Sequence, residues 1–152
     1  MRTATRLALL ALVALFVGGA PLAGATATKV GAGRTASAVK NRIVIQVNED
    51  DAKKWNAVLG NIRNIQAALG QKNVAIAVVV IGAGLGMLTA ESLAANGVQD
   101  AVAAGVEFLA CGNSMKAQSI DKDDLIAGVS VAVAGYVELM KRQQQGWAYL
   151  RP

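Results

Sequence analysis

The sequence reads VAIAVVVI at residues 74–81, and this run decides the fold because every one of its side chains is apolar. A strand that is apolar on both faces is typical of the centre of a parallel sheet, where helices cover each side. Before it, a β-branched run at residues 42–47 predicts a strand, and apolar residues spaced by three and four at residues 52–69 predict a helix. After it, the pattern alternates between further helices and strands. The predicted helices lie at residues 87–96, 98–104, 113–118, 119–126 and 136–145, and the predicted strands at residues 106–110, 128–133 and 147–150. We therefore expect one α/β domain, doubly wound around a mostly parallel five-stranded sheet.

Three glycines follow the central run, at Gly82, Gly84 and Gly86. A strand, a glycine loop and a helix in this order resemble a phosphate cradle. The dinucleotide fingerprint is incomplete, because Met87 stands at the third glycine position and Val102 stands where a ribose-binding acid is expected. The alternative is that the glycines allow a tight turn and close packing. Since ligands of open α/β sheets bind at the carboxyl ends of strands, we keep the three glycines as a candidate ligand loop.

The first 25 residues are typical of a cleavable secretory signal. Arg2 and Arg6 form a positive start, residues 7–17 are an apolar run, and residues 23–25 are small. The apolar run is shorter than the roughly 20 residues of a membrane-spanning helix. We expect a signal peptide at residues 1–25, a flexible mature N-terminus at 26–40 and one domain at 41–152. The mature protein would be periplasmic or secreted, with no membrane attachment after cleavage.

Composition excludes several kinds of chemistry. The chain has no histidine and one cysteine, which removes Ser–His and Cys–His catalysis and the usual zinc, copper and iron sites. We expect no metal and no cofactor. The formal charge of +5 falls to +3 without Arg2 and Arg6, and the remaining basic residues form no stripe with aromatic residues between them. Nucleic acid is therefore not expected as a partner.

The single cysteine, Cys111, lies in VEFLACGNSM at residues 106–115, where the predicted strand meets the predicted helix. A thiol at a helix N-terminus faces free backbone N–H groups, which favour the reactive thiolate. We expect an exposed nucleophile at Cys111, with the amides of Gly112 and Asn113 stabilising its charge. Two alternatives remain open: a small buried hydrophobic residue, and a redox-sensing thiol that pairs between subunits.

The cysteine segment, the glycine loop and the tail segments AGYVEL at residues 134–139 and QGWAYLRP at 145–152 occur in the order found in DsrE/DsrF-like proteins. From residue 42 to residue 152 the chain resembles this family. The resemblance implies a flavodoxin-like sandwich and a homo-oligomer, either a trimer or a hexamer. It also implies a sulfur relay in which Cys111 carries sulfur as a persulfide.

Two functions follow as hypotheses. In the first, the protein is an exported sulfur carrier or sulfurtransferase that exchanges sulfane sulfur with a donor or acceptor protein through Cys111. In the alternative, it is a non-catalytic oligomeric α/β binding protein in which the cysteine is structural. The reactivity of the folded thiol separates the two.

Overall fold

The computed structural model describes residues 41–152. The predicted signal peptide at residues 1–25 and the predicted mature N-terminus at 26–40 lie outside the described residues. Within residues 41–152, none of the helices combines the length and the apolar character needed to cross a membrane.

Five parallel strands form a single sheet in the order β4-β3-β2-β1-β5. Their bounds are β1 Asn41–Val47, β2 Val74–Val80, β3 Glu107–Cys111, β4 Ser130–Ala132 and β5 Ala148–Leu150. The central position predicted for the apolar run is confirmed, because β2 pairs with β1 on one side and β3 on the other. The α/β class and the five-stranded sheet are confirmed as well. The order differs from that of flavodoxin, since here the last strand lies beside the first.

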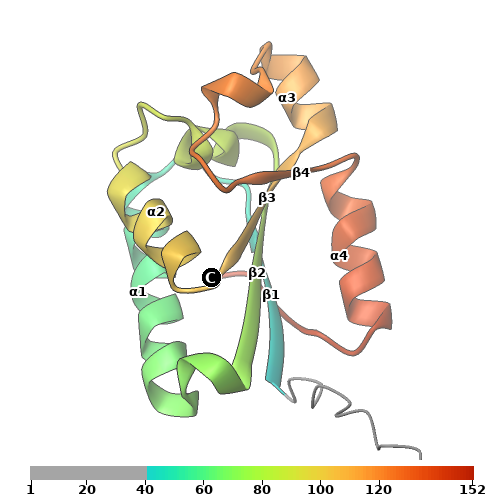
Figure 1. The fold of residues 1–152 in the computed structure, drawn as a ribbon. Helices are drawn as coiled ribbons and strands as arrows, with labels where there is room; N and C mark the ends of the chain where they lie inside the picture. The colour runs from blue at the N-terminus through green and yellow to red at the C-terminus, as the bar shows by residue number, and fades with distance from the viewer. Residues whose placement is uncertain (1–40) are drawn as a thin grey trace, which may run out of the picture. The chain divides into compact units, whose positions relative to one another are not determined.

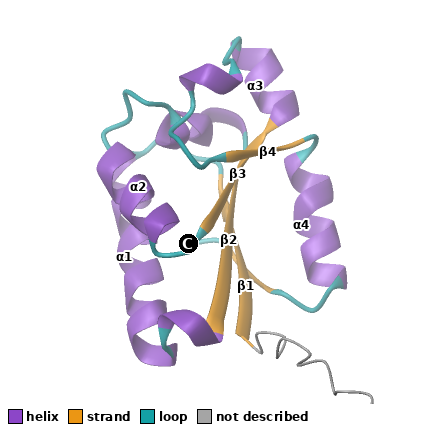
Figure 2. Cartoon of the chain, in the orientation of Figure 1, coloured by secondary structure: helices purple, strands orange, loops and turns teal. Residues whose placement is uncertain are grey.

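Helices cover both faces of this sheet (Figure 1). Helices α1 (Ala52–Leu69) and α2 (Ala95–Ala103) lie on one face, and α4 (Gly135–Gln144) is the one α-helix among the described residues that lies on the other (Figure 2). Helix α3 (Gly112–Gln118) follows directly on β3. Because side chains alternate along a strand, each face has its own apolar cluster. The smaller cluster lies on the α4 face and comprises Val44, Ala77, Val79, Ile81, Leu109, Cys111, Ala132 and Leu139.

The prediction of a helix at residues 87–96 is wrong. A 3-10 helix, η2 (Gly82–Leu88), occupies the glycine loop, and turns continue from it to α2. Tertiary packing explains the difference. A Cβ atom at Gly84 would lie 3.0 Å from Asn48 Cα, and Leu85 and Met87 are fully buried. Close backbone contact and buried side chains therefore hold this stretch in a tighter coil than its local pattern predicts.

The helix predicted at residues 119–126 is also shorter than expected. Only η3 (Lys122–Asp124) forms, and Asp121 and Asp124 make a reciprocal capping box around it. Ser119 instead ends α3 in the left-handed region, with φ at 53°. A further 3-10 turn, η1 (Gln71–Asn73), joins α1 to β2.

Candidate functional site

Cys111 is the last residue of β3 and the N-cap of α3, so the predicted join of strand and helix is confirmed. Its side chain points to the α4 face and packs in the smaller apolar cluster with Ile81 and Ala132. Only 4% of the residue is exposed. The prediction of an exposed thiol is therefore wrong, because the register of β3 turns this side chain inward, beneath the start of α4.

The sulfur accepts one hydrogen bond of ordinary geometry, from the backbone N–H of Gly135 at 3.2 Å. Gly135 is the first residue of α4, and its N-cap residue, Ala134, has no side chain able to accept the free amides. The Cys111 sulfur thus takes the acceptor role that a capping side chain would have. The positive end of the α4 dipole therefore faces the sulfur.

Several groups act on the pKa of Cys111. Burial is the largest effect and raises this pKa. The Ser114 hydroxyl and then the amides of Gly135, Ser114 and Asn113 lower it, and together they outweigh burial, so the pKa of Cys111 lies below its ordinary value. Hydrogen bonds from these groups therefore favour the thiolate at this site despite its burial.

The two predicted anion-stabilising residues differ in their placement. The amide of Asn113 is among the groups that lower the Cys111 pKa. Gly112 lies against β4, where a Cβ atom would be 3.2 Å from the Ala132 carbonyl oxygen. Sequence reasoning missed Ser114 and Gly135. The polar Ser114 lies in the first turn of α3 and could have been noticed, whereas Gly135 is 24 residues away from Cys111 and carries no local signal.

The three glycines of the candidate ligand loop contact two different parts of the structure. The N–H of Gly82 donates to Ser114 Oγ at 2.9 Å, which brings the start of the loop beside Cys111. Gly84 and Gly86 lie towards β1 and α1 instead, where a Cβ atom on Gly86 would be 3.3 Å from the Trp55 ring. The structure therefore gathers Gly82 with Cys111 but uses the other two glycines for close packing.

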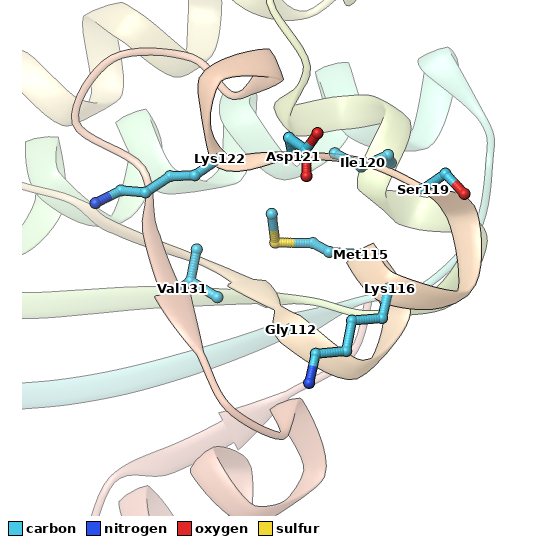
Figure 3. Close-up of a pocket in the computed structure, with 8 residues that line it drawn as sticks. All are labelled: Gly112, Met115, Lys116, Ser119, Ile120, Asp121, Lys122 and Val131. Atoms are coloured by element: carbon cyan, nitrogen blue, oxygen red, sulfur yellow. The ribbon is translucent and has the colours of Figure 1, made fainter.

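A cavity of about 640 Å³ opens beside α3, η3 and the edge strand β4 (Figure 3). Its lining residues are Gly112, Met115, Lys116, Ser119, Ile120, Asp121, Lys122 and Val131. It is not the entrance to the thiol. Val131 and Ala132 are adjacent in β4 and face opposite sides of the sheet, and Ala132 shares the side of Cys111. Residues 41–152 contain no group of three or more His, Cys, Asp or Glu residues that could hold a metal ion.

These features define an α/β domain with an all-parallel sheet and one cysteine at its carboxyl edge. The sequence model of the DsrE/DsrF-like family matches residues 42–152, and the chain belongs to this family. Three solved structures are similar to it. MTH1491 of Methanobacterium thermoautotrophicum, a protein of unknown function, is 37% identical, with a TM-score of 0.71 over 74% of this chain and 99% of that one.

The other two structures are more distant in sequence and show the fold alone. BT1422 of Bacteroides thetaiotaomicron, a conserved protein of unknown function, is 14% identical, with a TM-score of 0.63 over 77% of this chain and 99% of that one. The ychN protein of E. coli is 18% identical, with a TM-score of 0.59 over 74% and 99%. No curated protein matches the chain.

Proposed function

We propose that this protein is an exported sulfur-handling protein that carries sulfane sulfur as a persulfide on Cys111, as a carrier or a sulfurtransferase. The Cys111 thiolate attacks the outer sulfur of a donor persulfide, an S–S bond forms to Cys111, and the donor leaves as its thiolate. An acceptor thiolate then attacks the outer sulfur, and Cys111 returns to the thiolate. Both steps are thiol–disulfide exchanges, which thiolate character and access control. Membership of the DsrE/DsrF-like family supports the proposal.

The observation that carries the proposal is the hydrogen bond from Gly135 N–H to Cys111 Sγ at 3.2 Å. A buried thiol in apolar surroundings has a raised pKa and is inert. Here the pKa of Cys111 is lowered although only 4% of the residue is exposed, because hydrogen bonding by Ser114 and by the Gly135 and Asn113 amides outweighs the effect of burial. In the proposed exchange, the first turn of α4 moves aside so that a donor reaches the sulfur.

Mass spectrometry tests this proposal directly. The purified protein, incubated with a low-molecular-weight persulfide, should gain the mass of one sulfur atom, and the Cys111→Ser variant should gain none. A wild-type protein that takes up no sulfur would refute the proposal.

The second candidate function is a non-catalytic oligomeric α/β binding protein with a structural cysteine. The burial of Cys111 favours it, as does the role of the sulfur as the acceptor for the first amide of α4. This function predicts that the native thiol reacts with iodoacetamide only as fast as the protein unfolds. Alkylation much faster than global unfolding excludes it.

The proposal includes assembly into a homo-oligomer, a trimer or a hexamer. Within residues 41–152, one helix covers the α4 face, and apolar side chains remain exposed on this helix and just before it. Tyr136 is 65% exposed, Met140 48% and Val133 87%. Tyr136→Glu should lower the mass measured by sedimentation, whereas Lys141→Glu, on the same helix, should leave it unchanged. A wild-type protein that sediments as a monomer contradicts this part.

Export is proposed from the sequence of residues 1–25. The exported protein should begin near Thr26 when its N-terminus is sequenced, and replacing Arg2 and Arg6 by glutamate should keep it in the cytoplasm. An exported chain that still begins at Met1 would contradict a cleavable signal.

A further inference from the structure

The cavity of about 640 Å³ beside α3, η3 and β4 has the size and the place of a ligand site. Small-molecule sites in proteins have volumes of about 300–1,000 Å³. The cavity lies beside α3, which follows the carboxyl end of β3, and open parallel sheets bind their ligands at this edge. It takes no part in the proposed sulfur chemistry, because Val131, which lines it, faces the side of the sheet opposite to Cys111.

Hydrogen bonds within the chain set the shape of this cavity. Helix α3 ends at Ser119, and the N–H of Ile120 donates to the carbonyl oxygen of Met115 at 3.0 Å, so the chain turns back over the helix. The capping box of Asp121 and Asp124 then fixes η3. A ligand would therefore not have to order this segment on binding, which reduces the entropic cost of association.

The floor of the cavity is aliphatic. Figure 3 shows the Met115 side chain in the middle of the lining residues, with Ile120 and Val131 on either side of it. Val131 is 40% exposed although it is apolar, and it lies on the edge strand β4. Apolar surface at the bottom of a hollow favours a ligand with an apolar body, because binding removes both surfaces from water.

Two lysines, Lys116 and Lys122, lie at the edge of this floor (Figure 3). Neither ammonium group forms an ion pair with any residue of the described part of the chain. Asp121 is the acidic residue of the lining, and its carboxylate accepts a backbone N–H in the η3 capping box. Asp123 and Asp124 line a different cavity. The lining therefore carries two positive charges and one negative charge, a net charge of +1.

We propose that this cavity binds a small organic anion with an aliphatic body, of the class of short- and medium-chain carboxylates. The aliphatic body packs on Met115 and Val131, and the anionic group lies against the ammonium groups of Lys116 and Lys122. This site goes beyond the proposed function and does not depend on it, since Cys111 is not part of the lining. A protein that takes up no sulfur would leave the proposal unaffected.

Hexanoate is the probe, and protein labelled with ¹³C at the methionine methyl groups reports where it binds. Met115 lines the cavity, whereas Met140 lies on α4 and Met87 is fully buried. Hexanoate should shift the Met115 signal to saturation, with a dissociation constant on the order of 1 mM, and leave the other two signals unchanged. An unchanged Met115 signal overturns the proposal, as does a Met140 signal that shifts as much as that of Met115.

Two matched compounds separate the contributions of charge and body. Hexanamide has the same chain without the charge, and it should bind roughly threefold more weakly or worse. Acetate has the charge without the chain, and it should bind at least about tenfold more weakly. Raising the ionic strength to about 0.3 M should weaken hexanoate more than hexanamide, because salt screens exposed charges. Equal affinities for hexanoate and hexanamide overturn the assignment of an anion.

Lysine variants test which groups recognise the charge. Lys116→Met and Lys122→Met keep an unbranched apolar stem but remove the ammonium group. Each should weaken hexanoate roughly threefold, and the double variant roughly tenfold. Lys72→Met is the matched control, because Lys72 lies in η1 and does not line the cavity. Its affinity should equal that of the wild type, and a double variant that binds hexanoate as tightly as the wild type overturns the proposal. An unchanged signal from the buried Met87 verifies that each variant is folded.

Discussion

Substituting Gly135 by alanine should destabilise the protein, although alanine is the better helix former. Gly135 begins α4 directly above the thiol. A Cβ atom there would lie 2.7 Å from Ile81 Cγ1, 3.0 Å from Ile81 Cδ1 and 3.2 Å from Cys111 Cβ. Contacts this short require either α4 or the two side chains to move.

The size of the effect follows from two opposing terms. An extra methyl group in a well-packed core costs about 1–3 kcal/mol. Replacing glycine by alanine inside a helix gains about 0.5–1 kcal/mol, and less at a first position. The packing cost is the larger of the two, and we expect the free energy of unfolding to fall by about 1–2 kcal/mol. The melting temperature should fall by roughly 4–8 °C for each kcal/mol lost.

Urea unfolding of the wild type, Gly135→Ala and Gly60→Ala measures this difference. Gly60 is the matched control, because it lies inside α1 and a Cβ atom there would meet only the Arg63 side chain, at 3.8 Å. Gly60→Ala should stabilise the protein by about 0.5–1 kcal/mol. Adding Ile81→Ala to Gly135→Ala should remove part of the packing cost, seen as a coupling energy in the double-mutant cycle. A Gly135→Ala variant at least as stable as the wild type would show that the packing cost is absent.

Three further predictions concern charged groups. Arg142→Lys should lower the unfolding free energy by about 1–2 kcal/mol, because the guanidinium stacks 4.5 Å above the Trp147 ring and lysine cannot stack as a plane; equal urea midpoints would contradict this. Because the folded-state pKa of Cys111 is lowered, the unfolded chain binds more protons between the two pKa values. The stability of the wild type relative to Cys111→Ser should therefore rise as the pH increases through that window and be lost as the pH falls below it, and parallel pH profiles would disprove the shift. Arg151→Ala should raise the pKa of Glu49, which the hydrogen bond from Arg151 at 3.0 Å chiefly lowers, with little change in stability at this exposed pair; an unchanged NMR titration of Glu49 would show that the bond is absent in solution.

Local patterns predicted much of this fold. The central strand β2 was indicated by an unbroken apolar run, and α1 spans Ala52–Leu69, the range that its periodicity predicts. The join at Cys111 was predictable as well, since it depends on where one short run ends and a capping segment begins. The prediction of a helix after the glycine loop failed, because η2 depends on contacts with Asn48 and Trp55 that no local pattern encodes.

Local sequence patterns were sufficient to predict the five strands, the helices α1, α3 and α4, and the single thiol where a strand meets a helix, and the composition excludes histidine chemistry. The burial of this thiol beneath α4, its hydrogen bond from Gly135 24 residues away, and the bond between Ser114 and Gly82 across 32 residues all depend on tertiary contacts. The physical reason is distance along the chain. Periodicity and capping act over a few residues, whereas burial and hydrogen bonding at this site depend on segments that only the closed sheet brings together.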